Sequence, residues 1–213
     1  MTELVDIVGY NRKFNTRPRL SYLVIDNFLS NPMDTRNYVL EQEFSVSGNF
    51  PGRRTRPFSS SGIRDLIQKV IEPLTGKIIR FPMDNEEGKK NYNGAFQYTT
   101  SRDRTWIHCD TGNNWAGVLY LTPDAPLSSG TGIFRHKDTG IKREVEAKIK
   151  GVNDEINERS QDYTAWEQVD VIGNVFNRLV LFDSSQYHAS LDYFGTTPQN
   201  GRLFQTFFFT TER

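Results

Sequence analysis

The chain has 213 residues with one cysteine, and its 26 Lys and Arg residues balance its 26 Asp and Glu residues. This length suffices for one well-buried domain, while the neutral charge excludes a global attraction to nucleic acid or to an anionic membrane. The single cysteine excludes an internal disulfide framework, and the sequence shows neither an apolar run of transmembrane length nor the pattern of a signal peptide. We therefore expect a soluble, cytoplasmic protein.

The first part of the chain predicts one strand and two helices. Residues 1–19 carry little pattern and are expected to wrap the domain or to fray. Residues 21–25 are typical of a short buried strand. Asn31 and Pro32 then indicate a helix start, because Asn is a good N-cap and Pro suits the first helical position. A second helix is predicted over 63–74, where apolar residues recur every three or four positions.

A loop rich in Gly, Pro and Ser lies between these helices, over residues 45–61. It contains three arginines, Arg53, Arg54 and Arg56. A solvated basic loop is the simpler interpretation of this cluster. The alternative is that the arginines hold an acidic group of a substrate.

From residue 93 the apolar pattern changes from the helical period to that of strands. Short strands separated by turn residues, without helices over much of this half, favour a double-stranded β-helix, or jelly roll. In such a fold, residues far apart in sequence face each other inside the barrel. The eight predicted strands cover residues 94–99, 105–111, 115–122, 132–136, 170–176, 179–183, 187–193 and 202–210.

Residues 138–168 interrupt this series of strands. Apolar residues from Ile141 to Ile156 recur at helical spacing among many charges, so we predict a surface helix that is broken near Gly151. Two roles remain open for this insert. It is either a lid or substrate-contacting element at the mouth of the barrel, or a helix that covers the outside of a sheet.

The stretch around His108 and Asp110 carries the first sign of chemistry. On a strand these two side chains point to the same face, while Ile107 and Cys109 point to the other, where we expect Cys109 to be part of the core. An imidazole and a carboxylate side by side supply two ligands of a 2-His-1-carboxylate triad, which leaves several positions of Fe(II) open. A lone His-x-Asp is a weak signal, so its meaning depends on residues further along the chain.

Three residues downstream complete the pattern. His188 follows the apolar run 179–183, and Arg202 opens an aromatic-rich strand. A guanidinium deep in a site is a natural fork for a carboxylate, because its donors match two oxygens at once. Thr206 lies on the same strand face as Arg202 and could add a hydroxyl to that pocket.

The order His108, Asp110, His188, Arg202 resembles that of the 2-oxoglutarate/Fe(II)-dependent oxygenases, in particular their prolyl-hydroxylase-like branch. The likeness covers about residues 90–210. It implies that the two histidines and the aspartate bind Fe(II) and form the catalytic centre, with 2-oxoglutarate and O2 as co-substrates and Arg202 as the anchor of 2-oxoglutarate. It also implies two N-terminal helices that brace one face of the barrel.

Two tyrosines match positions that bind the co-substrate in similar hydroxylases. Tyr98 matches a tyrosine beside 2-oxoglutarate, and Tyr120 matches one whose hydroxyl binds the distal carboxylate. For each of them, a core tyrosine with a satisfied hydroxyl is the alternative.

Other assignments also remain open. His136 is expected at the surface or at a strand end, and it is the rival of His188 as the distal iron ligand. Arg178 is the rival of Arg202, although its place just before a buried strand suits a turn better. A cupin-type jelly-roll metalloenzyme that does not use 2-oxoglutarate, and a non-catalytic jelly-roll binding module, are the alternatives to an oxygenase.

We thus expect a mostly β protein with N-terminal helices, organised as one domain over residues 1–213. Residues 1–90 would brace the core, and residues 91–213 would form the jelly-roll core with a helical insert near 138–168. The expected reaction is hydroxylation of a C–H bond of a peptidyl residue, an amino acid or a small molecule, with conversion of 2-oxoglutarate to succinate and CO2. Neither nucleic acid nor membrane is expected as a partner.

Overall fold

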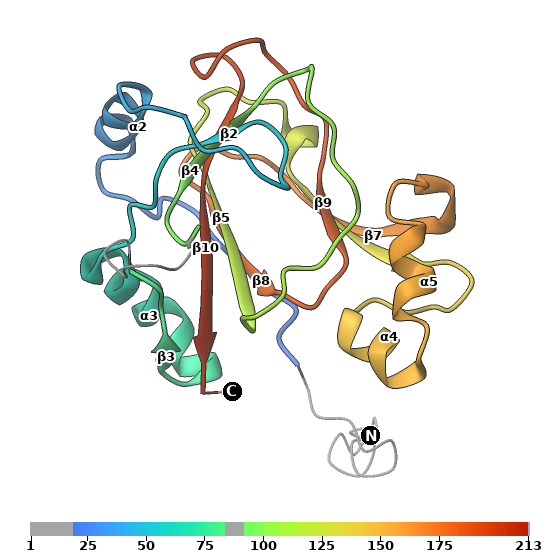
Figure 1. Ribbon diagram of the computed structural model, residues 1–213. Helices are drawn as coiled ribbons and strands as arrows, with labels where there is room; N and C mark the ends of the chain where they lie inside the picture. Colours follow the sequence, from blue (N-terminus) through green and yellow to red (C-terminus); the bar gives the residue numbers. More distant parts are fainter. Residues whose placement is uncertain (1–18, 84–91, 213) are drawn as a thin grey trace, which may run out of the picture.

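The computed structural model describes residues 19–83 and 92–212, so the prediction for residues 1–19 lies almost entirely outside the described residues. Two antiparallel sheets form the centre of the molecule (Figure 1), which confirms a mostly β architecture. The strands are β1 Tyr22–Ile25, β2 Arg53–Arg54, β3 Ile78–Arg80, β4 Phe96–Thr99, β5 Trp115–Tyr120, β6 Thr131–His136, β7 Trp166–Ile172, β8 Leu179–Asp183, β9 His188–Ser190 and β10 Arg202–Thr211.

The two sheets differ in size. The larger sheet has the strand order β1-β8-β5-β10-β4-β2, with β3 pairing to β10 outside this path. The smaller sheet has the order β7-β6-β9. The central strand β10 is ten residues long and pairs with both β4 and β5. Its neighbours come from distant parts of the chain, so the larger sheet joins residues from both halves of the sequence.

The alternation of side chains along β10 divides the interior into two regions. Leu203, Phe207 and Phe209 belong to a core cluster shared with the helices. Phe204 and Thr206 point the other way and line a cavity between the sheets. Because successive side chains of a strand point to opposite faces, one strand separates a packed core from a hollow interior.

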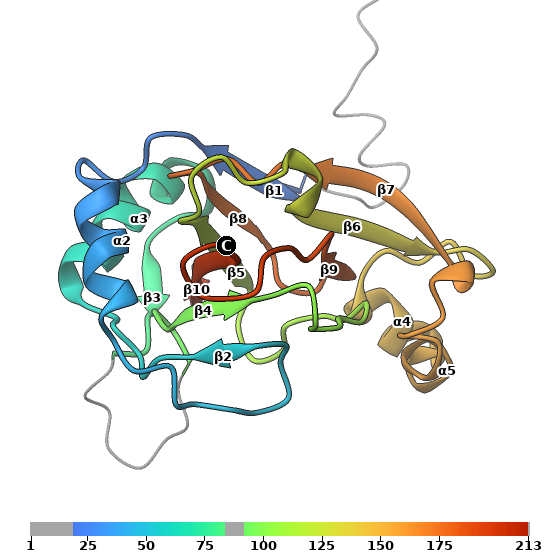
Figure 2. The same ribbon diagram turned by 90° about the horizontal axis from the view of Figure 1, so that it is seen from above.

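Two helices pack on the outer face of the larger sheet. They are α2 Pro32–Leu40 and α3 Ser61–Thr75, and Figure 2 shows both on the side away from β6 and β7. Val39, Ile67 and Ile71 are fully buried in the helix-side core. Pro32 occupies the start of α2 as predicted, but Asn31 makes no capping hydrogen bond through its side chain.

Four short helical segments lie in the second half of the described chain. These are α4 Glu144–Lys150, α5 Asn153–Glu158 and two 3-10 turns at Leu127–Ser129 and Tyr163–Ala165. Gly151 ends α4 in the left-handed conformation with φ of 70°, so the predicted break in the insert is present. Ala147 and Ile156 pack into a cluster with Trp166 of β7. The insert thus covers the smaller sheet, and none of its described residues lines the cavity.

Residues 105–111, predicted as a strand, do not form a strand paired within either sheet. The chain there is extended, and its backbone bonds go to separate loops: Ile107 N donates to Ser160 O, and Asp110 N donates to Ser184 O. Only His108 forms an isolated bridge, to His188. The prediction of 170–176 is also displaced, because β7 begins at Trp166, and the predicted strand 187–193 shortens to β9.

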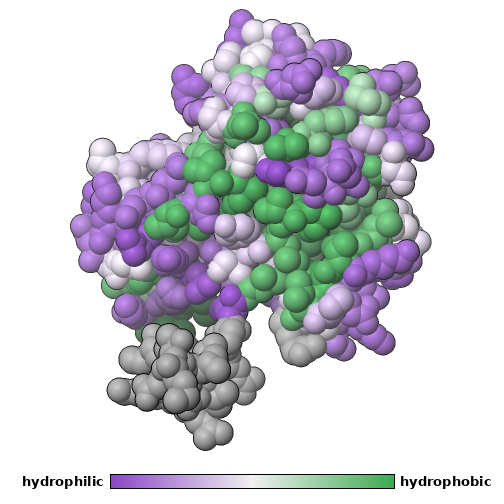
Figure 3. Space-filling view, turned by 180° about the vertical axis from the view of Figure 1, so that it is seen from behind, coloured by the Kyte–Doolittle hydropathy of each residue, from purple (hydrophilic) through white to green (hydrophobic). Residues whose placement is uncertain are grey.

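Apolar side chains also reach the surface. Figure 3 shows apolar residues gathered across the middle of the rear face. Large apolar residues that remain exposed on or beside the helices include Met33, Tyr38, Leu74 and Ile79. Over the described ranges, the helices are all too short or too polar to span a lipid bilayer.

Candidate metal centre and adjoining cavity

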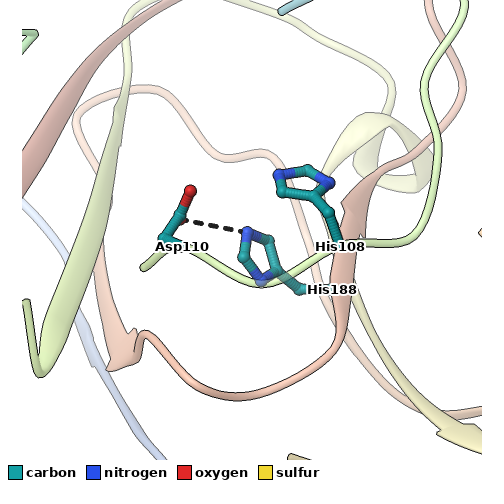
Figure 4. Close-up of side chains that lie close together, drawn as sticks. All are labelled: His108, Asp110 and His188. Carbon is teal, nitrogen blue, oxygen red and sulfur yellow. Dashed lines mark ion pairs between the residues drawn. The ribbon is translucent and has the colours of Figure 1, made fainter. Parts of the chain in front are cut away.

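The backbone brings the two histidines and the aspartate together. His108 and His188 form an antiparallel bridge in which each backbone N–H donates to the other residue's carbonyl, at 3.0 and 2.8 Å. One donor atom from each of His108, Asp110 and His188 lies within 4.8 Å of the others. Figure 4 shows the His188 ring facing Asp110, with the His108 ring beside it. The structure therefore joins residues separated by most of the barrel sequence.

Backbone carbonyls orient both imidazole rings. Nδ1 of His108 lies 2.9 Å from Trp106 O, and Nδ1 of His188 lies 2.9 Å from Gln186 O. A carbonyl only accepts, so Nδ1 carries the proton in each neutral ring, which leaves Nε2 as the nitrogen that can bind a metal ion. Nε2 of His188 is 3.3 Å from Asp110 Oδ2. This is the tautomer that a metal ion needs, held by the type of outer partner that metal-binding histidines use.

The charges of the three residues support one another. Burial disfavours the ionised Asp110, but His188 and its hydrogen bond outweigh this effect and hold the pKa of Asp110 below its ordinary value. Burial and the neighbouring His188 lower the pKa of His108. For His188, burial acts in the same direction, but the Asp110 carboxylate outweighs it and raises the pKa of the ring. The site thus favours a carboxylate and a neutral His108, two forms that bind metal.

These side chains lie on the wall of a cavity of about 820 Å³ between the sheets. Aromatic residues form much of the surrounding wall, including Trp106, Phe182 and Phe204. The ring of Phe182 packs edge-on against His188, with centroids 4.6 Å apart. A cavity of this size is in the range of small-molecule binding sites.

Arg202 is completely buried and is not itself one of the residues that line this cavity. Its Nε donates to Ser129 O at 2.8 Å and its Nη2 to Gly130 O at 3.3 Å, whereas its Nη1 has no partner within the described parts of the chain. The guanidinium also stacks near the ring of Phe204, which lines the cavity. A buried cation without an acidic partner is costly unless an anion arrives.

Tyr120 and Thr131 lie beside this guanidinium. The two hydroxyls are 2.7 Å apart, and Thr131 lines the cavity. Burial raises the pKa of the Tyr120 hydroxyl, and the charge of Arg202 offsets part of that rise. Thr206 also lines the cavity, although its hydroxyl donates to backbone carbonyls, Ala95 O among them. Arg202, Tyr120 and Thr206 are thus all placed at or next to the cavity.

Tyr98 is placed elsewhere. In the pairing of β4 with β10 it stands opposite Leu203, and its ring packs edge-on against Phe44 in the helix-side core. Directly paired residues share a face, so Tyr98 points away from the cavity. The prediction of a tyrosine beside the co-substrate is not supported by this position, and Gln97 lines the cavity in its place. Strand alternation indicates that one of the two must face inward, but not which one.

The rival residues are separated from the site. Arg178 pairs with Asp26 at 2.6 Å, away from the cavity. His136 ends β6 as expected, yet it is buried rather than exposed, with its ring packed on Trp166 and Nδ1 beside Thr139. The insert over the smaller sheet is what buries it. Cys109 is only partly buried, and its thiol donates to Ser185 O.

The basic loop also differs from the simpler prediction. Arg53 and Arg56 are exposed, as a solvated loop would have them, but Arg54 is buried and lines the cavity. The reason is the pairing of β2 with β4, which sets Arg54 opposite the inward-facing Gln97. The local sequence pattern does not distinguish the buried Arg54 from the two exposed arginines.

Two solved structures illustrate which known proteins have a similar fold. HygX from Streptomyces hygroscopicus, with nickel and 2-oxoglutarate bound, is 13% identical, and the match covers 94% of this chain and 85% of that one with a TM-score of 0.57. The non-heme alpha-ketoglutarate-dependent epimerase SnoN from nogalamycin biosynthesis is 14% identical, with 94% and 82% covered and a TM-score of 0.52. The fold is therefore that of the 2-oxoglutarate- and iron-dependent oxygenases, and the predicted resemblance is confirmed at this level.

The chain itself belongs to a family of unknown function, DUF6445, whose model matches residues 11–209. No curated protein matches the sequence. The family thus defines the chain's relatives, while the chemistry has to be argued from the site.

Proposed function

We propose that this protein is an Fe(II)- and 2-oxoglutarate-dependent dioxygenase that hydroxylates a C–H bond of a peptidyl residue, an amino acid or a small molecule. The observation that carries the proposal is the combination of two neighbouring features. His108, Asp110 and His188 present three metal-ligand atoms together on the cavity wall. Next to the cavity, against Phe204 of its wall, Arg202 is fully buried with a free Nη1 among the described residues.

The donor set fits a divalent metal of the iron group. Two imidazole Nε2 atoms and a carboxylate are ligands suited to Fe(II), and thiolates that would favour a structural zinc site are absent from this group. The Nδ1 bonds to backbone carbonyls already fix the rings in the ligating tautomer. HygX, which shares the fold, has been solved with iron and with nickel and 2-oxoglutarate. We expect His108, Asp110 and His188 to hold the metal here.

The buried Arg202 fits the distal carboxylate of 2-oxoglutarate. Its guanidinium offers a charged donor at Nη1, and Tyr120 and Thr131 add hydroxyls next to it. An arriving carboxylate would supply the missing counter-charge in a site from which water is excluded. A jelly-roll metal protein that does not use a dicarboxylate would have no need for such an arginine. This favours the oxygenase over the cupin-type and non-catalytic alternatives.

Iron, 2-oxoglutarate and O2, when bound, supply the oxidation, in which 2-oxoglutarate becomes succinate and CO2 and the substrate gains a hydroxyl group. The chain's own part is orientation and protection. Phe182, Phe204 and Phe208 line the cavity with apolar surface, which keeps water away from the reacting atoms. The bridge between His108 and His188 holds the two rings in place during turnover.

We further propose that the two sheets form a double-stranded β-helix, and that residues 1–213 act as one domain in which the N-terminal helices brace the larger sheet. The proposal is supported by the packing of α2 and α3 on that sheet. It is also supported by the way the ligands meet, since His108 and His188 come from segments 80 positions apart and face each other across the interior.

Paired histidine variants test the metal assignment. His188→Ala should abolish Fe(II) binding and 2-oxoglutarate turnover, because it removes one of three ligands. His136→Asn is the matched control, since Asn retains a donor for Thr139 and His136 lies outside the ligand group. It should leave metal binding and turnover near wild type. Metal titration, succinate release and thermal unfolding are measured on both. Equal loss in two folded variants would show that the distal ligand is misassigned.

A further inference from the structure

A second buried arginine in the cavity has no role in holding the metal or anchoring 2-oxoglutarate. Arg54 is 9% exposed and lines the cavity wall. Its Nε donates to Gln97 Oε1 at 2.6 Å. Across residues 19–83 and 92–212, neither Nη1 nor Nη2 takes part in a hydrogen bond or ion pair. The two terminal nitrogens of this cavity-lining residue are thus charged donors without a hydrogen-bond partner among the described residues.

The surroundings of Arg54 hold its guanidinium in one orientation. The ring of Phe50 lies 3.9 Å from the guanidinium carbon, and the ring of Tyr92 lies 5.1 Å from it. Gln97 is fixed in turn, because its Nε2 donates to Pro51 O at 2.6 Å. Two aromatic rings thus lie beside the guanidinium, and Gln97 accepts the hydrogen bond from its Nε. The remaining edge is the fork that matches two oxygens of a carboxylate.

The charges in the cavity favour an anion. Among the described residues that line it, Asp110 is the sole acidic side chain, and it serves the metal site. Arg54 and Arg80 are the lining cations, and Arg80 already donates to Gly112 O. Burial lowers the pKa of Arg54 to about 10, which still leaves the guanidinium charged at neutral pH. A buried charge that keeps two free donors is costly in the absence of a ligand.

We propose that Arg54 binds a carboxylate of the prime substrate, so that the substrate is a carboxylic acid held beside Phe50 and Tyr92 with its reacting carbon toward the metal site. This inference rests on the proposed function, and it adds a substrate class to it. In this proposal Arg202 binds a carboxylate of the co-substrate, and Arg54 binds a carboxylate of the substrate. One cation suits a carboxylate better than a phosphate dianion, which would require further donors.

The test compares acids with their amides. The probes are free amino acids, N-acetyl amino acids and tripeptides, each as the free carboxylic acid and as the C-terminal amide. They are titrated calorimetrically into protein loaded with Mn(II) and 2-oxoglutarate. At least one acid should bind roughly 30-fold or more tightly than its amide, because the amide lacks the charge that pairs with Arg54. The type of acid that binds best distinguishes a small molecule from a peptide terminus.

Two neighbouring arginines supply the matched variants. Arg54→Gln should abolish the preference for the acid while leaving the affinity for 2-oxoglutarate near wild type. Arg53→Gln changes the adjacent residue of β2, which is exposed and outside the cavity, and should keep the preference intact. Arg54→Lys should recover part of it, because the ammonium keeps the charge but not the fork. Thermal unfolding of each variant reports whether it folds.

Three results would overturn the proposal. The first is that acids bind no more tightly than their amides, or that no acid binds. The second is that folded Arg54→Gln still prefers the acid. The third is that Arg54→Gln loses as much affinity for 2-oxoglutarate as it loses for the acid. The last result would make Arg54 part of the co-substrate site. The proposed function is tested separately in the same samples, since its failure would appear as absent 2-oxoglutarate binding in the wild-type protein.

Discussion

Replacing Arg202 separates an oxygenase from a generic metal protein. Arg202→Met keeps much of the side-chain volume but removes the charge and all donors. In the wild-type protein the Arg202 guanidinium donates to Ser129 O and Gly130 O, and its Nη1 has no partner among the described residues. A bound carboxylate would therefore form charge-assisted hydrogen bonds with Arg202 that Met cannot provide. Loss of one partner of such a buried pair costs about 2 to 5 kcal/mol, or roughly 30- to several-thousand-fold in affinity.

Calorimetric titration with Mn(II) and then 2-oxoglutarate measures the two affinities in turn. Arg202→Met should weaken 2-oxoglutarate binding by at least tens of fold, and metal affinity should stay near wild type because Arg202 contacts no ligand residue. Arg178→Ala is the control, since Arg178 is paired with Asp26 away from the cavity. Unchanged 2-oxoglutarate binding in folded Arg202→Met, with or without an effect of Arg178→Ala, would refute the role given to Arg202.

Two further predictions concern the loops and the core. Limited proteolysis should cut within residues 45–61 less readily once metal, 2-oxoglutarate and substrate are bound, because Phe50 and Arg54 of this loop line the cavity. Cutting within residues 138–168 should not change, because this insert packs on the smaller sheet. Ile71→Ala should lower the free energy of unfolding by about 2 to 5 kcal/mol, because Ile71 is a fully buried residue of α3 in the helix-side core. Urea unfolding measures this change, and a loss well under about 1 kcal/mol would contradict the packing described.

The features predicted well from the sequence are those that depend on local pattern. The apolar run of β8 and the aromatic run of β10 were placed to within a residue, because period and residue type suffice for a long buried strand. The start of α2 at Pro32 and the break at Gly151 follow from the backbone preferences of Pro and Gly. The grouping of His108, Asp110 and His188 was expected from residue order, and the structure places them together.

The features that were missed depend on partners distant in sequence. Tyr98 faces the helices because β4 pairs with β10 in a register that no local pattern reveals. Arg54 is inward because β2 pairs with β4, whereas Arg53 and Arg56 are exposed. His136 is buried because the insert packs over the smaller sheet. The segment around His108 bonds to loops instead of a ladder, and extended sequence alone does not distinguish the two.

The most direct test of the central claim is the visible absorption spectrum of the anaerobic protein with Fe(II) before and after addition of 2-oxoglutarate. A weak charge-transfer band should appear only with both, because a keto acid bound to ferrous iron through two oxygens absorbs in this way. His188→Ala should not show it, while His136→Asn should. A folded wild-type protein that binds Fe(II) but shows no band on saturation with 2-oxoglutarate would contradict the account.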